Sequence, residues 1–141
     1  MIYFEKELSF VNAYLDIEKV RFDDELLISY DIAVSNFKLP VLTVQPIVEN
    51  AVKHGTSKKI GVSSLYISTR ESDAFYEIEI RDTGVGFDES IQLDDGRKHI
   101  GISNVRQRLE TLCNGTLTIE STPGVGTTAL IKIPKTEVYS K

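Results

Sequence analysis

The sequence has one cysteine, no long apolar run and no cluster of basic residues, and each shortage excludes a class of protein. Cys113 cannot form an internal disulfide or a cysteine-rich metal site, which is typical of a protein from a reducing compartment. Because the apolar runs are only a few residues long, we expect neither a signal peptide nor a membrane span. The net charge of −5, without a run of lysines or arginines, argues against a nucleic-acid partner or an anionic membrane surface.

The length of 141 residues, with 41% hydrophobic and 26% charged residues, is typical of one ordinary globular domain. The start at Met1 leads directly into a charged helical pattern, so the chain is either a complete small protein or an excised domain. An acidic protein that binds an anion has to do so locally, through backbone N–H groups, a lysine or a metal ion.

The periodicity of the apolar residues predicts an α+β fold, with a helical layer on one side of a largely antiparallel sheet. We expect Thr43 to cap the second helix and Gly55 to end it, while Gly115 ends the third. The predicted helices span residues 4–22, 43–55 and 102–114, the predicted strands span 26–32, 64–71, 74–82, 116–122 and 127–134, and a long loop covers 82–101.

The stretch PIVENAVKHG (46–55) places four polar side chains close together on the second helix. At ~100° per residue, Glu49, Asn50, Lys53 and His54 fall within an arc of roughly 140°, and apolar residues occupy the opposite side. For a helix taken alone, the ordinary interpretation is a solvated surface. The alternative is a binding face that offers an amide oxygen to a divalent cation and an ammonium group to a phosphate.

Three glycine motifs, DTGVGFD, HIGISN and PGVG, are each weak signals because glycine also favours ordinary turns. Their combination is more informative. Asp82 ahead of a Gly-x-Gly can accept a hydrogen bond from an exocyclic amine beside a flat ring. Gly101 at a predicted helix start leaves N–H groups for phosphates. With Asn50 and Lys53, these motifs predict a site for a magnesium nucleotide.

The same motifs resemble the ATP-binding domain of sensor histidine kinases, in the gyrase, Hsp90, histidine kinase and MutL superfamily, and most closely its LytS-type branch. LPVLTVQPIVENAVKHG matches the N box, DTGVGFD the first glycine box, GISNVRQRL the second and PGVGTTALIKIP the last. The resemblance implies a two-layer α/β sandwich of the Bergerat type with a mixed, mostly antiparallel sheet. It also implies a linker helix over 1–23, the ATP-binding catalytic domain over 24–136 and a tail over 137–141.

Carried over residue by residue, the resemblance implies how ATP and Mg²⁺ would be held. Asn50 would ligate Mg²⁺, Lys53 would contact the phosphates, and Asp82 would bind the adenine amine. The other matching positions would surround the nucleotide, with His54 at the base or ribose, Gly84 and Gly86 beside the purine, Gly101, Ser103 and Asn104 at the phosphates, and Gly124, Gly126 and Thr127 closing the adenine pocket.

Two positions depart from the family pattern. His99 stands where the second glycine box usually has its first glycine, and we expect its side chain to point outward, although it would otherwise stiffen or block the lid. Pro46 stands where hydrolysing members carry a glutamate base, so efficient ATP hydrolysis is not expected. Glu49 is the remaining carboxylate of the polar face, and we hypothesise that it orients or deprotonates a histidine acceptor.

The implied activity is transfer of the ATP γ-phosphoryl group to a histidine on a separate dimerisation domain, from which a response regulator then takes it. That acceptor is absent from this chain, since both of its histidines fall in nucleotide boxes, so we expect poor self-labelling. The parent would be a membrane-anchored homodimer with this domain in the cytoplasm. Two alternatives stay open, namely a serine protein kinase of the anti-sigma-factor type and a non-catalytic nucleotide-dependent interaction module.

Overall fold

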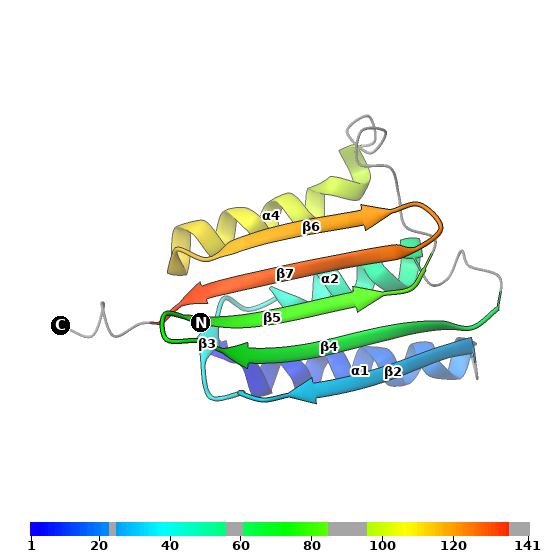
Figure 1. Cartoon of the computed structure of the whole chain (residues 1–141), viewed down its shortest axis with the longest axis horizontal. Coiled ribbons are helices and arrows are strands. Elements are labelled where there is room, and N and C mark those ends of the chain that lie inside the picture. Colours follow the sequence, from blue (N-terminus) through cyan, green and yellow to red (C-terminus); the bar gives the residue numbers. More distant parts are fainter. Residues whose placement is uncertain (23–24, 56–60, 85–95, 136–141) are drawn as a thin grey trace.

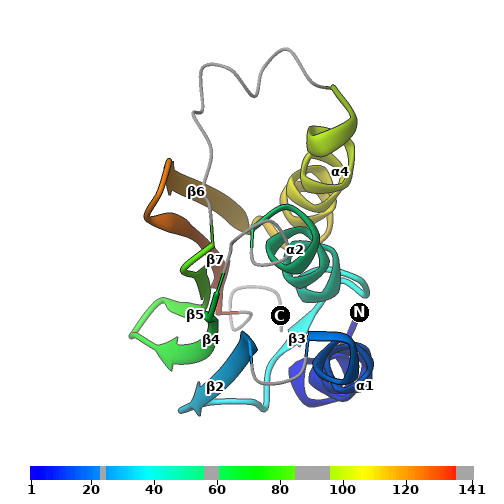
Figure 2. The same ribbon diagram turned by 90° about the vertical axis from the view of Figure 1, so that its right-hand side faces the viewer.

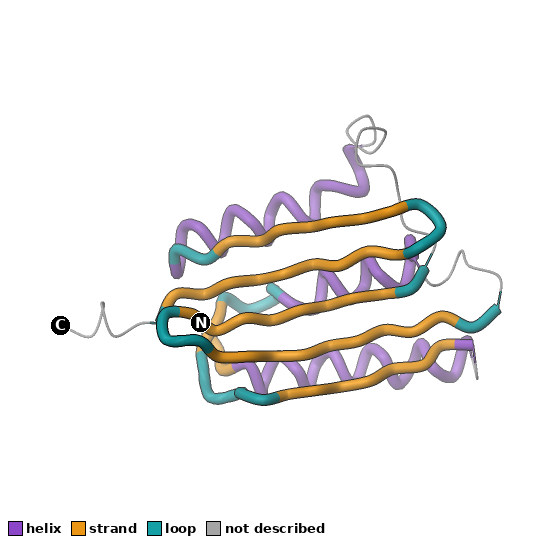
Figure 3. The backbone as a smooth tube through the Cα atoms, viewed as in Figure 1, coloured by secondary structure: helices purple, strands orange, loops and turns teal. Residues whose placement is uncertain are grey.

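The centre of the fold is a five-stranded sheet, seen in a computed structural model that describes residues 1–22, 25–55, 61–84 and 96–135, with the backbone alone for 54–55 and 96–101. β2 pairs in parallel with β4, and the other neighbouring strands are antiparallel, which confirms the predicted mixed sheet. The strand order across the sheet is β2 (Leu26–Ile32), β4 (Ser63–Glu71), β5 (Phe75–Asp82), β7 (Gly126–Pro134) and β6 (Thr116–Thr122) (Figures 1 and 3).

The helices lie on one face of this sheet and leave the other face open (Figure 2). They are α1 (Phe4–Phe22), α2 (Val44–Asn50), the π-helical η2 (Ala51–Gly55) and α4 (Gly96–Cys113). This arrangement confirms the predicted two-layer α+β sandwich. None of the described helices is both long and apolar enough to cross a membrane.

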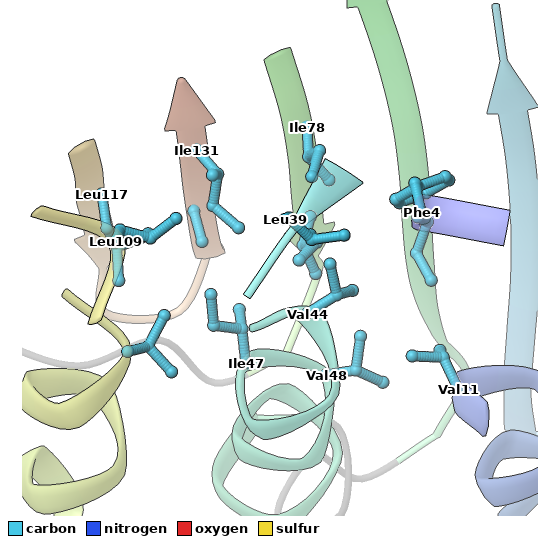
Figure 4. Packing of buried hydrophobic residues seen from close by; sticks show 14 of the residues in the cluster. Phe4, Val11, Leu39, Val44, Ile47, Val48, Ile78, Leu109, Leu117 and Ile131 are labelled. Atoms are coloured by element: carbon cyan, nitrogen blue, oxygen red, sulfur yellow. The ribbon is translucent and has the colours of Figure 1, made fainter. Parts of the chain in front are cut away.

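The hydrophobic core fills the space between the two layers. Figure 4 shows Val11 of α1, Val48 of α2 and Leu109 of α4 packed towards Ile78 and Ile131 of the sheet, and all five side chains are buried. Each such side chain contributes about 1.5–3 kcal/mol through burial. α1 is therefore part of the same core as the strands. The prediction that α1 is also a linker helix, which would connect this domain to a further segment, remains a prediction.

A short sheet joins the beginning of α1 to the segment before α2. β1 (Ile2–Tyr3) pairs with β3 (Lys38–Leu39), and the rings of Phe4, Phe37 and Tyr76 stack one on the next. We did not predict these strands, because two residues are too few to show an alternating pattern.

The cap of α2 differs from the prediction. The Thr43 side chain does not cap the helix and donates instead to the carbonyl of Pro40. Glu7 of α1 takes this role, since its Oε2 accepts hydrogen bonds from the Val44 and Gln45 N–H groups at 2.5 and 3.0 Å. A carboxylate satisfies these free N–H groups, and its negative charge is stabilised by the positive end of the helix dipole. The prediction failed because the capping residue comes from 37 positions earlier.

The ends of α4 also differ from the prediction. The helix begins at Gly96, so Gly101 lies more than a turn inside it, whereas we expected a start near residue 102. At the other end Asn114, rather than Gly115, adopts the left-handed conformation, with φ of 57°. The Gly115 N–H then donates to the Leu109 carbonyl at 2.9 Å, six residues earlier, so that a carbonyl of the last helical turns is satisfied just beyond the left-handed residue.

Candidate nucleotide-binding site

Asp82 stands at the last position of β5, and its side chain lies on the helix-covered face with only 4% exposure. Its Oδ1 accepts a hydrogen bond from the Gly84 N–H at 2.9 Å. Thr83 fastens the strand end to β4, because its N–H donates to the Ser64 carbonyl at 3.0 Å and its Oγ1 accepts from the Ser64 N–H at 2.8 Å. The carboxylate is therefore held in a fixed direction where the sheet ends.

The last glycine box passes directly over the first. Gly126 has φ of 141°, and a Cβ added to it would lie 2.0 Å from the Asp82 carbonyl oxygen. Only glycine fits such an approach. Gly124 lies two residues earlier with φ of 81°, and a Cβ added to it would meet no atom within 4 Å, so glycine is required there for its conformation alone. Two motifs that lie more than forty residues apart in the sequence thus share one corner of the fold.

A row of polar side chains crosses the end of the sheet on the buried face. Asp82 pairs in register with Thr127, which pairs with Ser121 of β6. The hydroxyl oxygens of Ser121 and Thr127 are 2.7 Å apart. Thr127 was predicted as a site residue, whereas Ser121 was missed. The alternation of TLTIEST places Ser121 on the same face as Leu117 and Ile119, and that pattern could have identified it.

The N-box helix runs beside this corner, because η2 contacts both β5 and β7. The predicted division of the helix is confirmed for the described side chains: Val44, Ile47, Val48 and Val52 are buried, whereas Glu49 and Asn50 are half-buried and Lys53 is exposed. Asn50 is the last residue of α2, and it lies next to the end of β5 where Asp82 stands. The two segments predicted to bind metal and base are thus neighbours in space.

The predicted single α-helix through Gly55 is wrong after Asn50. The backbone continues as a π-helix, and the Ala51 N–H is shared between the carbonyls of Ile47 and Val48 at the junction. A π turn holds more residues than an α turn, so the arc calculated for an α-helix does not apply to Lys53 and His54. Such single turns are frequent at functional sites.

Glu49 is held from within its own helix and lies near α1. Its Oε2 accepts a hydrogen bond from the Gln45 side chain at 3.1 Å. Tyr14 of α1 is close enough that burial, with added repulsion from the charges of Glu18 and Glu49, raises the pKa of its hydroxyl to about 12. The Tyr14 hydroxyl has no hydrogen-bond partner in the described part of the chain. Glu49 therefore lies on the side of α2 that is near Tyr14 of α1.

Some of the remaining predicted residues have a described environment, and for others the structure gives the backbone alone or nothing. Ser103 and Asn104 are exposed on α4, which packs against α2, and Gly84 is buried next to Asp82. Gly124 is exposed in the turn before β7. Gly101 belongs to α4, while the side chains of His54 and His99 and the whole of Gly86 lie outside what the structure describes.

Two cavities lie mainly on the open face of the sheet, away from the N-box helix. One of about 400 Å³ is lined by side chains of β2, β4 and β5, among them Arg70 and Glu79, which form an ion pair at 3.1 Å. The other, of about 380 Å³, is lined by residues at the ends of β5, β6 and β7, and three of the predicted site residues, Asp82, Gly126 and Thr127, are among them. The guanidinium of Arg81 stacks on the Tyr66 ring between them. Polar hollows of this kind are typical of a solvated sheet face.

The chain is similar in sequence to known sensor proteins. The chain is 45% identical over 78 residues to the sensor histidine kinase BtsS of Escherichia coli strain K12, covering 54% of this chain and 14% of that protein. It is 35% identical over 88 residues to the sensor protein LytS of Streptococcus agalactiae, covering 62% of this chain and 15% of that protein. The chain thus spans about one seventh of the length of each of these two relatives.

The fold is similar to that of a solved kinase domain. The nucleotide-free catalytic domain of histidine kinase ThkA superposes with a TM-score of 0.71 over 96% of this chain and 97% of that domain, at 12% sequence identity. The sequence model described as histidine kinase-, DNA gyrase B- and HSP90-like ATPase matches residues 38–137, which include every motif named above. The chain belongs to this family of ATPase domains.

Proposed function

We propose that the chain is the ATP-binding catalytic domain of a sensor histidine kinase. The observation that carries this proposal is the corner where Asp82, buried at the end of β5, meets the glycine backbone of the last box. A buried carboxylate with fixed direction recognises an exocyclic amine, and a backbone without a Cβ lets a planar base lie close. Membership of the family implies ATP as the ligand.

The residues around this corner fit the rest of a magnesium nucleotide. Asn50 offers an amide oxygen of the kind that Mg²⁺ accepts, and Lys53 brings a positive charge to the same helix. When bound, the metal ion would neutralise charge on the transferring phosphoryl group. The contributions of the chain itself are to orient the base through Asp82 and to hold the phosphates beside η2.

The acceptor of the phosphoryl group is proposed to be a histidine on a separate dimerisation domain of the parent protein, which hands it to a response regulator. BtsS is named as a sensor histidine kinase, which supports this choice. The parent is proposed to be a membrane-anchored homodimer that keeps this domain in the cytoplasm. Glu49, half-buried beside Asn50, is proposed to orient the incoming imidazole or to take its proton.

Calorimetric titration with a non-hydrolysable ATP analogue tests the binding site. We expect Asp82→Asn to weaken binding by at least about tenfold, because the amide cannot accept the same hydrogen bonds while it keeps the shape of the side chain. Asp73→Asn, an exposed change in the β4–β5 turn, is the matched control and should bind as the unaltered chain does. Equal affinity for all three proteins would contradict the proposed site.

The metal and the transfer step need separate measurements. Titration with and without Mg²⁺ should show a metal-dependent gain in affinity that Asn50→Ala loses. For transfer, the chain joined to the histidine-bearing segment of its parent should acquire an acid-labile label from ATP, and Glu49→Gln should slow this step while binding ATP normally. An acid-stable label would indicate a serine acceptor, and transfer unchanged in Glu49→Gln would remove the role proposed for that residue.

A further inference from the structure

The outer edge of β2 is a strand edge that the described part of the chain leaves unpaired. β2 stands at one end of the sheet, and its neighbour among the described strands is β4 (Figure 1). Just after β2, the Ala33 N–H donates to the Thr69 carbonyl of β4 at 3.3 Å. Because successive backbone groups alternate in direction along a strand, the N–H and C=O groups of Ile28, Tyr30 and Ile32 point away from β4.

This edge exposes apolar side chains. At its beginning, the Lys19 ammonium group of α1 donates to the Leu26 carbonyl at 2.9 Å and covers that end. Further along the strand, Leu27 and Tyr30 are 47% and 45% exposed. Native proteins usually blunt a strand edge with charges, proline or a covering element, and an exposed apolar edge is a template for another strand.

The opposite edge of the sheet, β6, is different in character. Arg106 of α4 donates twice to the Leu117 carbonyl of this strand, at 3.2 and 3.1 Å. The exposed side chains of β6 are polar, namely Thr116, Thr118, Glu120 and Thr122. Of the two edges of the sheet, β2 is therefore the one that offers apolar surface to a further strand.

A polar hollow opens beside β2 on the open face of the sheet. This cavity of about 400 Å³ is lined by Ser29 and Asp31 of β2 together with Tyr66, Arg70 and Glu79 of the next two strands. Arg70 and Glu79 pair with each other, whereas Asp31 is exposed and forms no ion pair with a described residue. Because Ser29 is small, a side chain from beyond β2 can reach across it to Asp31.

The charges around this edge indicate which kind of strand fits it. Asp31 and Glu25 are exposed at its two ends. On the helix side, burial and the nearby charge of Asp16 raise the pKa of the Tyr30 hydroxyl, which places that carboxylate beside the edge. Three carboxylates against the single ammonium of Lys19 favour a basic partner. A second copy of this chain, with its net charge of −5 and the same carboxylates, would be repelled.

We propose that β2 accepts an extended, basic segment of a partner protein as a sixth strand of the sheet. The backbone of that segment pairs with the outward groups of Ile28, Tyr30 and Ile32, which supplies affinity. Its alternate side chains supply selectivity. Apolar residues lie beside Tyr30 on the helix side, and a lysine or arginine crosses Ser29 to Asp31 on the open side. β4 separates β2 from β5, so this binding does not require ATP.

Titration with a designed peptide, followed by nuclear magnetic resonance, tests the binding. The probe is the blocked peptide KVTVKVTVK, in which lysine and threonine alternate with valine. We expect a dissociation constant below about 1 mM. The amides of Ile28, Tyr30 and Ile32 should shift and gain protection from hydrogen exchange. The same peptide with glutamate in place of lysine should bind at least about tenfold more weakly. Equal affinity for the two peptides, or no binding of the lysine peptide, overturns the proposal.

Proline at an outward position tests the backbone pairing. Tyr30→Pro removes an N–H group that points away from β4, a position at which edge strands tolerate proline. It should weaken binding of the lysine peptide at least about fivefold, because a hydrogen bond is lost and the proline ring faces the added strand. Tyr30→Thr keeps the N–H group and is the matched control. Equal affinity of two folded variants overturns the proposal.

Charge reversal tests the basic side chain and leaves the backbone intact. Asp31→Lys should weaken binding of the lysine peptide about fivefold, since it replaces an attraction with a repulsion. Asp73→Lys, an exposed change of the same charge in the β4–β5 turn, is the control and should bind as the unaltered chain does. Circular dichroism confirms that both variants are folded. The same affinity for Asp31→Lys and Asp73→Lys overturns the proposal.

Sedimentation equilibrium without peptide tests a second copy as the occupant of the edge. We expect the unaltered chain, Tyr30→Pro and Tyr30→Thr to show the same degree of association at every concentration. Association that Tyr30→Pro abolishes and Tyr30→Thr retains would show that β2 pairs with β2 of another copy, and it would overturn the proposal.

Discussion

The two glycines of the last glycine box are required for different reasons. Gly126 is required by sterics, since its Cβ would overlap the Asp82 backbone, whereas Gly124 is required only by its positive φ. The sequence motif PGVG contains both and does not distinguish them. The close approach depends on the register of β5 with β7, which pairs Asp82 with Thr127, and a single sequence does not specify that register.

We expect Gly126→Ala to destabilise the fold by more than about 3 kcal/mol, because the backbone of either Gly126 or Asp82 would have to move. Gly124→Ala is the matched control and should cost only about 1 kcal/mol, from the strained φ alone. Urea denaturation of both variants measures the difference. Similar losses in the two variants would contradict the close packing of the glycine boxes.

Glu7 is a buried carboxylate whose protonation is linked to folding. Burial raises its pKa above the ordinary 4.5, although the N–H groups of Gln45, Val44, Thr43 and Leu42 oppose the shift. Between 4.5 and the raised pKa, the folded chain binds a proton at Glu7 that the unfolded chain has lost. The contribution of Glu7 to the free energy of unfolding is therefore largest below pH 4.5 and falls as the pH rises through that window.

The measurement is the free energy of unfolding of the unaltered chain and of Glu7→Gln from pH 4 upward, by urea denaturation. The difference between the two proteins should decrease with rising pH and level off above the raised pKa, because glutamine does not titrate. Two parallel curves would contradict the linkage.

The hydroxyl of Tyr14 is a further single-atom test. It is buried and has no hydrogen-bond partner among the described residues. We expect Tyr14→Phe to leave stability unchanged or to raise it by up to about 1 kcal/mol, since the change removes a polar atom that gained nothing from burial. Thermal denaturation would detect this, and a loss of more than 1 kcal/mol would mean that the hydroxyl has a partner.

At the scale of elements, strand and helix identities could be predicted from the sequence and several of their ends could not. α1, β2, β4, β5, β6 and β7 lie within one residue of the predicted positions, because 7 to 19 residues carry a clear period. The start of α4 at Gly96 was missed, since GRKHIG shows no apolar repeat. The π turn after Asn50 was missed as well, because no residue type marks it.

The end of α4 provides a prediction of its own. Asn114 has φ of 57°, a conformation that glycine adopts without strain and alanine does not. Asn114→Ala should therefore be less stable than Asn114→Gly by about 1 kcal/mol, as measured by urea denaturation. Comparing the two variants with each other cancels the loss of the asparagine side chain itself. Equal stabilities would show that the strain of the left-handed residue is relieved elsewhere.

At the scale of the whole molecule, the sequence predicted the motifs of the site but not the contacts between distant residues that complete it. The resemblance identified Asp82, Gly126 and Thr127, and they meet at one corner. It did not identify Ser121, which enters through cross-strand pairing, or Glu7, whose role depends on helix packing. Both depend on contacts between distant parts of the chain, which local patterns do not encode.

Integrity of the whole fold should depend on α1, although the family match begins only at residue 38. A chain that begins at residue 24 would lose the core contacts of Phe4, Val11 and Leu15 and the cap that Glu7 provides. Its stability should fall by several kcal/mol, enough to abolish cooperative unfolding in a domain of ordinary stability. Near-ultraviolet circular dichroism and urea denaturation measure this. A truncated chain that unfolds cooperatively at the original urea concentration would show that α1 is dispensable.

The hydrogen bonds from the first turn of α2 to the Glu7 carboxylate couple the position of α2 to that of α1. A slide of α1 by one turn, about 5.4 Å, would withdraw the oxygen from both N–H groups and leave them bare within the protein. Any pull or twist applied along α1 would then loosen the beginning of the helix whose other end holds Asn50. We therefore expect a displacement of α1 to change the position of Asn50, which is proposed to ligate Mg²⁺.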